Sequence, residues 1–147
     1  MNFNVRAYGL LIHPNTGAWL IAHENMDGFA FTKFPGGGVQ FGEGPEDAVI
    51  REFKEECEFE VKIKQHIYTT GFYQPSAFRP DDQIISIYYR MENVKNSWVL
   101  PPLRKVNLDA SLNHWLVCEW VLPENIKEDT FTFPIDRYVF RLLQNGQ

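Results

Sequence analysis

The segment from Gly37 to Phe59, GGVQFGEGPEDAVIREFKEECEF, carries the strongest structural signal of the chain. Its most informative feature is a group of three carboxylates, at Glu52, Glu55 and Glu56. On a helix that advances about 100° per residue, these side chains share one arc of roughly 100°. Like charges held this close repel one another unless a cation neutralises them. Because all the donors are oxygen atoms, the pattern predicts a site for Mg²⁺ or Mn²⁺ rather than for zinc.

The residues around the carboxylates predict a helix that begins near Gly44 and Pro45. Proline is favoured in the first turn of a helix, and the acidic residues after it suit the positive end of the helix dipole. A compact apolar stripe runs beside the carboxylates and consists of Val49, Ile50, Phe53 and Cys57. This stripe must pack against a core, so we expect one buried face of the helix next to the face that holds the cation.

The spacing of the whole stretch resembles the box of the Nudix hydrolase family, G-x5-E-x7-R-E-U-x-E-E-x-G-U, in which U is aliphatic or aromatic. Gly37, Glu43 and Arg51 fall at the first three fixed positions, and the three glutamates follow. The last glycine of the box is replaced by Glu58. That glycine normally ends the helix in a left-handed conformation, which costs other residues about 1 kcal/mol or more. We therefore expect a frayed or differently capped end of the helix here.

The resemblance implies an α/β fold, a Nudix-type α/β/α sandwich with a mixed sheet between helices. It also implies that Glu52, Glu55 and Glu56 bind one or more Mg²⁺ ions, with Mn²⁺ as the alternative. The backbone carbonyl of Gly36, just before the box, would be a further metal ligand. A glycine-rich segment suits this role, because it lets the backbone approach a metal and phosphates closely.

The resemblance further places Arg51 with the three glutamates among the catalytic residues. Arg51 and Glu43 look like the family's supporting pair, which together with Gly37 would hold the loop and the carboxylates in place. Glu55 is a metal ligand or a general base. Other candidates for the base are Asp81, Asp82, His114 and Glu119. For the last two, an ordinary polar position on a strand face or loop is the simpler interpretation.

The activity implied by the resemblance is Mg²⁺-dependent hydrolysis of a nucleoside diphosphate linked to another group. Compounds like ADP-ribose, nucleotide sugars and nucleoside triphosphates are the candidate substrates. The alternative is a Nudix-fold domain that binds a nucleotide, or regulates through it, without cleaving it. The intact set of carboxylates favours the enzyme, because a binding role alone would not require this metal geometry.

Candidate substrate contacts lie in the first predicted strand and in the segment 72–79. Arg6 and Tyr8 alternate along the strand and share one face, which often borders the substrate pocket in Nudix proteins. Phe78 and Arg79 are expected to stack on a base and contact phosphate. Pro75 lies 16 residues after the box, a spacing similar to that of members that hydrolyse ADP-ribose. For each of these residues, a purely structural role is at least as simple an explanation.

Length and composition limit the class of protein. A chain of 147 residues fits a single domain, here predicted to span residues 1–147. The formal net charge of −5 disfavours nucleic acid or an anionic membrane as a partner. The small nucleotide partner is what the family resemblance implies. No apolar run approaches about 18 residues, and the start of the chain does not resemble a signal peptide. Two cysteines indicate no disulfide framework, so we expect a cytoplasmic location. The sequence is consistent with a monomer or a homodimer.

Alternating and periodic apolar residues predict the remaining elements. Strands are expected at 3–13, 18–24, 29–34, 38–41, 59–73, 83–92 and 113–122, a helical turn at 123–126 and a helix at 134–145. The first two strands should form a hairpin around a turn at 15–17. The segment 94–112 is long for a connection and is equally consistent with a lid, a dimer contact or a surface loop.

Overall fold

A mixed sheet lies at the centre of the protein, whose computed structural model describes residues 1–102, 104–105 and 113–146. Its strands are, in spatial order, β4 (Gly36–Gly38), β1 (Asn2–Leu10), β6 (Asp82–Asn93) and β5 (Val61–Thr69). β1 and β6 run parallel, and the other pairs run antiparallel. β1 is buried over residues 7–10, as expected for a strand with a parallel neighbour and with layers on both faces.

A second sheet is entirely antiparallel. Its spatial order is β3 (Phe29–Lys33), β2 (Trp19–Met26), β8 (His114–Val121) and β7 (Arg104–Lys105). β7 falls inside the long segment 94–112, most of whose second half lies outside the described residues, so the three interpretations of that segment stay predictions.

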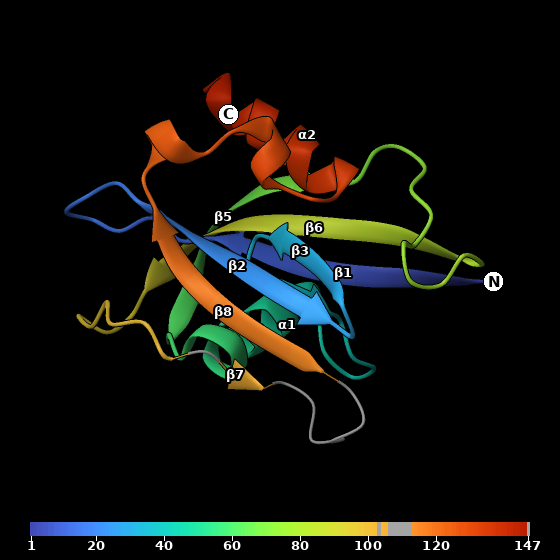
Figure 1. Ribbon diagram of the computed structural model, residues 1–147, viewed down its shortest axis with the longest axis horizontal. Helices are drawn as coiled ribbons and strands as arrows, with labels where there is room; N and C mark the ends of the chain where they lie inside the picture. The colour runs from blue at the N-terminus through green and yellow to red at the C-terminus, as the bar shows by residue number, and fades with distance from the viewer. Residues whose placement is uncertain (103, 106–112, 147) are drawn as a thin grey trace.

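Two helices cover opposite sides of the strands (Figure 1). α1 (Pro45–Glu52) continues into a π-helical turn, η1 (Phe53–Cys57), and α2 (Pro134–Gln144) lies near the end of the chain. Two 3₁₀ turns, η2 (Pro123–Asn125) and η3 (Glu128–Thr130), precede α2. The predicted α/β/α sandwich with a mixed sheet between helices is therefore confirmed. Among the described residues, no helix has the length and hydropathy that a membrane crossing requires.

The apolar stripe of α1 and η1 packs as predicted. Val49, Phe53 and Cys57 are fully buried in one core cluster, where Cys57 contacts the thiol of Cys118 on β8. The helix approaches β1 closely at Gly9, because a Cβ atom at this position would lie 2.6 Å from the Phe53 ring. A second cluster, around Phe34, Tyr88, Phe131 and Val139, joins α2 to the strands. The two clusters fix the helices on either side of the site.

The predicted hairpin between residues 3–13 and 18–24 is wrong. β1 and β2 belong to different sheets, and they meet only near the turn, where Ile12 pairs with Trp19. There the His13 amide donates a hydrogen bond of 2.8 Å to the Ala18 carbonyl. Beyond the turn the strands separate, because both long edges of β1 are occupied by β6 and β4.

The end of the box helix is ordered rather than frayed. Glu58 itself adopts the left-handed conformation that glycine would take, with φ 59° and ψ 25°. The Phe59 amide then donates to the Phe53 carbonyl at 3.3 Å and closes the turn. Cys57 and Phe59, on either side of Glu58, are both buried. Burial of these two neighbours outweighs the strain of about 1 kcal/mol at Glu58, which explains why the expected fraying is absent.

Candidate functional site

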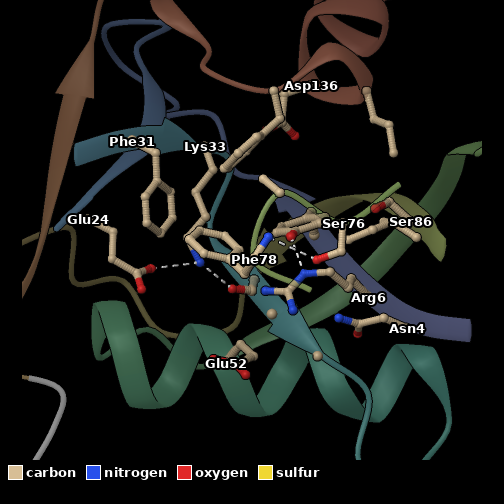
Figure 2. A pocket seen from close by; sticks show the side chains of 18 of the residues that line it. Asn4, Arg6, Glu24, Phe31, Lys33, Glu52, Ser76, Phe78, Ser86 and Asp136 are labelled. Atoms are coloured by element: carbon tan, nitrogen blue, oxygen red, sulfur yellow. Dashed lines mark hydrogen bonds and ion pairs between the residues drawn. The ribbon is translucent and has the colours of Figure 1, made fainter. Parts of the chain in front are cut away.

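A pocket of about 990 Å³ lies between the two sheets, next to the box helix and the start of α2. Figure 2 shows Glu52, from the helix, at one end of it and Asp136, from α2, at the other. Arg6, Lys33 and Phe78 project into the space between them. The pocket therefore joins an acidic end, a basic middle and a partly aromatic end.

Two glycines of β4 allow this packing. A Cβ atom at Gly37 would lie 2.5 Å from Oε1 of Glu52, so no side chain fits there without moving the carboxylate. Gly36 has φ 149°, and a Cβ atom there would lie 2.1 Å from the Ala7 carbonyl oxygen of β1. The glycines thus let the backbone of the loop lie directly against both the sheet and a carboxylate of the helix.

Arg51 and Glu43 form the link that was predicted to support the loop. The Arg51 guanidinium donates to both carboxylate oxygens of Glu43, at 3.0 Å from Nε and 2.7 Å from Nη2. Nη2 also donates to the Gly38 carbonyl at 3.1 Å, and the Gln40 amide donates to Glu43 at 2.8 Å. The hydrogen bond from Arg51 is the main reason that the pKa of Glu43 falls to about 2.

The same arginine holds two of the three predicted metal ligands. Nη1 of Arg51 lies 3.1 Å from Oε1 of Glu52 and 3.1 Å from Oε2 of Glu55. The side chain of Glu52 is 14% exposed and that of Glu55 is 58% exposed. Glu52 therefore faces the pocket from a sheltered position, whereas Glu55 lies at its solvent edge.

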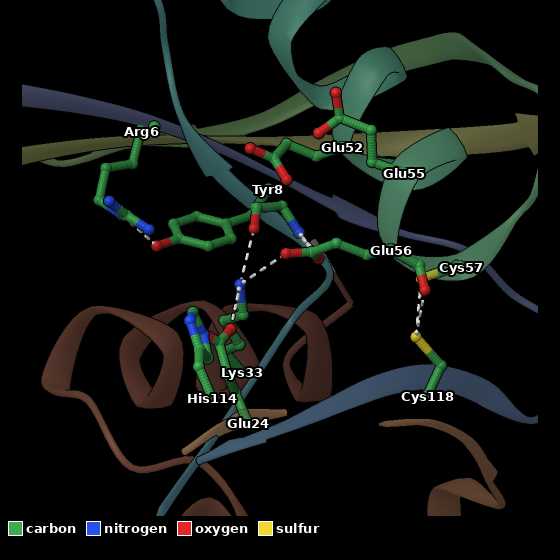
Figure 3. A network of polar contacts seen from close by, with 12 residues as sticks. Arg6, Tyr8, Glu24, Lys33, Glu52, Glu55, Glu56, Cys57, His114 and Cys118 are labelled. Atoms are coloured by element: carbon green, nitrogen blue, oxygen red, sulfur yellow. Dashed lines mark hydrogen bonds and ion pairs between the residues drawn. The ribbon is translucent and has the colours of Figure 1, made fainter. Parts of the chain in front are cut away.

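The third carboxylate, Glu56, faces a buried lysine that was not predicted. Nζ of Lys33 donates to the Gly36 carbonyl at 2.7 Å and lies 3.5 Å from Oε1 of Glu56 (Figure 3). The Gly36 amide donates to the other oxygen of Glu56 at 3.4 Å. The carbonyl of Gly36 and the carboxylate of Glu56 are thus held together by an ammonium group.

Lys33 extends this network to the second sheet. Its ammonium lies 3.2 Å from Oε1 of Glu24, and Nε2 of His114 lies 2.5 Å from Oε2 of the same carboxylate. Burial lowers the pKa of Lys33, but the carboxylates of Glu56 and Glu24 raise it. Together with smaller effects they leave the pKa above its ordinary value, so the lysine stays charged. Burial raises the pKa of Glu56 to about 7, the carboxylates of Glu52 and Glu24 raise it too, and Lys33 lowers it.

The described part of the chain holds no group of three acidic, histidine or cysteine side chains gathered closely enough for a metal ion. Glu55 forms an ion pair with Arg51. Glu56 is turned toward Lys33 (Figure 3). The predicted ligands nevertheless line one pocket, including Glu52 and Gly36. All of their donors are oxygen atoms, and Glu56 lies among carboxylates that raise its pKa. This donor set and this crowding of negative charge fit a hard divalent cation.

Arg6 and Tyr8, both predicted as substrate contacts, lie on the pocket wall formed by β1. Nε of Arg6 donates to the Tyr8 hydroxyl at 2.6 Å. The Lys33 ammonium lies 5.8 Å from the centre of the Tyr8 ring, over its face. Two cations, Arg6 and Lys33, are therefore positioned around one tyrosine in the middle of the pocket.

Pro75, Phe78 and Arg79 also line the pocket, as predicted candidates from the segment before β6. Pro75 forms an isolated bridge with Gln83, so its backbone also has a structural role. Arg79 is largely exposed and lies 3.9 Å from Oδ2 of Asp82. The three residues are close together in the sequence, and they lie on the same wall of the pocket.

The structure places some candidates for the general base in the pocket and others outside it. Asp82 and His114 line the pocket, and His114 is held by Glu24. Asp81 is exposed, and a carboxylate oxygen of Glu119 forms a hydrogen bond of 2.7 Å with Nε2 of His23. The simpler structural interpretation given to Glu119 agrees with this hydrogen bond.

Four further residues that line the pocket carried no signal in the sequence analysis. They are Lys33, Phe31, Phe133 and Asp136. Lys33 and Phe31 alternate along β3 and so share a face, which the pattern of that strand could have indicated. Asp136 was hidden in the first turn of a helix, where an acidic residue is ordinary.

The comparison with protein families identifies the class of protein. The family model of the NUDIX domain matches residues 3–143, so the chain belongs to the Nudix family. Membership supports hydrolysis of a pyrophosphate bond in general. Nudix hydrolases generally use divalent metals and act on small nucleotide substrates.

Solved structures are similar over nearly the whole chain. The MutT protein from Methanosarcina mazei is 18% identical, with a TM-score of 0.69 over 99% of this chain and 96% of its own. The E. coli ORF135 protein is 16% identical, with a TM-score of 0.70 over 99% and 91%. A Nudix hydrolase from Nitrosomonas europaea is 16% identical, with a TM-score of 0.70 over 97% and 89%. At these identities the likeness shows the fold alone. A comparison with curated proteins gives no match.

Proposed function

We propose that this single Nudix domain is a Mg²⁺-dependent hydrolase that cleaves the pyrophosphate bond of a nucleoside diphosphate linked to another group. The observation that carries this proposal is the juxtaposition, in one pocket, of the acidic wall of Glu52 and Glu56 with the cations Arg6 and Lys33. A polyphosphate needs both kinds of group, because its own charge repels an attacking nucleophile until it is neutralised. The free thiols of Cys57 and Cys118 fit a cytoplasmic protein.

Glu52, Glu55, Glu56 and the Gly36 carbonyl would hold the metal, and Mn²⁺ is the alternative ion. When bound, the ion supplies Lewis-acid chemistry, which neutralises phosphate charge and lowers the pKa of a coordinated water. Arg51 and Glu43 keep the loop against the helix, since their paired hydrogen bonds tie Gly38 to the carboxylates.

The basic residues act on the substrate itself. Arg6 and Lys33 lie in the middle of the pocket, where they would bind the phosphate oxygens and orient the diphosphate beside the carboxylates. Lys33 is buried and stays charged, so it adds a fixed positive charge without the cost of reorganising during the reaction. Besides Glu55, which is here assigned to the metal, Asp82 and His114 are the candidates for proton transfer that line the pocket.

A second candidate function is nucleotide binding without cleavage. It is favoured by one observation, that Arg51 and Lys33 already neutralise Glu55 and Glu56 through ion pairs. A panel of ADP-ribose, nucleotide sugars and nucleoside triphosphates, incubated with Mg²⁺ or with EDTA and followed by mass spectrometry, separates the two functions. Products that form with Mg²⁺ and not with EDTA support the hydrolase, and a protein that binds members of the panel but releases no product supports the alternative.

The role of Glu56 is tested by Glu56→Gln on the best substrate of that panel. We expect kcat to fall by about 100-fold or more, because the amide removes a negative charge from the metal site while keeping the shape of the side chain. Glu60→Gln is the matched control, since Glu60 carries the same carboxyl group on the surface, paired with Lys95. Near-normal turnover by the Glu56 variant would remove this residue from the site.

A further inference from the structure

The ammonium group of Lys33 directly contacts two of the proposed metal ligands. Its Nζ donates to the Gly36 carbonyl at 2.7 Å and lies 3.5 Å from Oε1 of Glu56. One of these ligands belongs to β4 and the other to η1. The lysine side chain is only 5% exposed, so it belongs to the interior of the site. A cation of the protein itself therefore binds the same oxygen atoms that the divalent ion would bind.

The fold holds these two ligands together in one place. Gly36 pairs with Tyr8 in the mixed sheet, and a Cβ atom on it would lie 2.1 Å from the Ala7 carbonyl oxygen, so its backbone has little room to turn. The Gly36 amide also donates to Oε2 of Glu56 at 3.4 Å. Two cations bound to these oxygens in a buried site would repel each other strongly. Binding of a divalent ion there therefore requires that the ammonium of Lys33 move away.

Lys33 has other partners toward which it can move. Oε1 of Glu24 lies 3.2 Å from Nζ, and the centre of the Tyr8 ring lies 5.8 Å from it. Figure 3 shows Lys33 between Glu56, from η1, and Glu24, from β2. A lysine suits such an exchange, because its compact ammonium lies at the end of a flexible four-carbon stem. The ammonium could thus leave Gly36 and Glu56 and still be paired.

A purely structural ion pair is the simpler interpretation, in which Lys33 ties β3 to η1. On this interpretation, removing the lysine would leave its buried carboxylate partners less well held, and the affinity for a metal would fall. Competition predicts the opposite, because removing the lysine would free the oxygens for the ion. The two interpretations therefore differ in the direction in which one affinity changes.

We propose that Lys33 is an internal counter-ion that competes with the divalent cation for the Gly36 carbonyl and Glu56, and so limits the affinity of the site for the ion. The inference rests on the proposed function, in which these oxygens bind the metal. Lys33 is thus a positioning residue, which keeps the buried oxygens together and neutralised until the ion replaces it. Its ammonium then turns to Glu24 and to the phosphate oxygens of the substrate.

The test is a titration with Mn²⁺, in which electron paramagnetic resonance measures the free ion, for the wild-type protein, Lys33→Met and Arg6→Met. Methionine is also unbranched and removes the ammonium. We expect Lys33→Met to bind Mn²⁺ about 10-fold more tightly than the wild-type protein. Arg6→Met is the matched control, because Arg6 is a second cation of the pocket whose hydrogen bond goes to the Tyr8 hydroxyl. It should change the affinity by less than about 3-fold.

Equal or weaker Mn²⁺ binding by Lys33→Met would overturn the competition, and so would an equal gain in Arg6→Met. Circular dichroism will show whether the variants are folded. If the methionine variant is not, Lys33→Gln takes its place in the titration, since its amide still offers a donor to the Gly36 carbonyl. If neither variant folds alone, millimolar Mn²⁺ should restore the native spectrum, because the ion replaces the ammonium. Chains that stay unfolded in Mn²⁺ would also overturn the inference.

The titration also separates this inference from the proposed function. Failure of every protein, including Lys33→Met, to bind Mn²⁺ would count against both. Binding by the wild-type protein without a gain in Lys33→Met would count against the counter-ion alone. Tighter binding by Lys33→Met, with no hydrolysis by any of the proteins, would support the counter-ion and count against the proposed cleavage.

Discussion

At the scale of single residues, the burial of Asp136 affects the stability of the folded protein. Burial raises its pKa from 3.8 to about 7, despite the opposing effect of the Tyr88 hydrogen bond. Between these two values the folded protein keeps a proton that the unfolded chain has lost. The folded state therefore binds more protons in this interval, and the free energy of unfolding must fall as the pH rises through it.

Asp136→Asn should remove this part of the pH dependence. Urea unfolding between pH 4 and 7 should give a slope that is less negative than that of the wild-type protein by up to about 1.4 kcal/mol per pH unit. Glu56 also has a raised pKa, to about 7, but it is present in both proteins, so the difference between them isolates Asp136. Parallel stability curves would mean that Asp136 titrates as an exposed acid does.

At the scale of the elements, the end of the box helix shows local strain held by the packing on either side. Glu58 lies in the left-handed region with φ 59°, between the buried residues Cys57 and Phe59. The strain comes from the Cβ atom, which every residue except glycine carries.

Glu58→Gly and Glu58→Ala, compared with each other, isolate that strain because both remove the carboxylate. We expect the glycine variant to be more stable than the alanine variant by about 1 kcal/mol. Thermal or urea unfolding of the two variants measures the difference. Equal stabilities, or a more stable alanine variant, would show that the turn does not depend on its left-handed residue.

The elements also show which parts of the fold the sequence could predict. The box helix and its buried face follow from spacing within one turn, so Val49, Phe53 and Cys57 were placed correctly. The first hairpin was wrong, because the partner of β1 is β6, more than seventy residues away, and local alternation does not encode such a partner.

At the scale of the whole molecule, the site forms where two sheets and two helices meet. The box predicted Glu52, Glu55 and their support from Arg51, since those contacts lie within one short segment. Lys33 and Asp136 were missed, because each finds its partners on other elements of the fold. Lys33 meets Glu56 across 23 positions, and Asp136 meets Tyr88 across 48. Such contacts depend on the topology rather than on any pattern in one element.

The central claim is that the three glutamates of the box helix hold a divalent cation. Its most direct test is a titration of the protein with Mn²⁺, in which electron paramagnetic resonance measures the free ion, for the wild-type protein, Glu56→Gln and the surface control Glu60→Gln. We expect bound Mn²⁺ in the wild-type protein and the control, and an affinity about 10-fold or more lower in Glu56→Gln. No binding at millimolar Mn²⁺, or equal affinity in all three proteins, would contradict the claim.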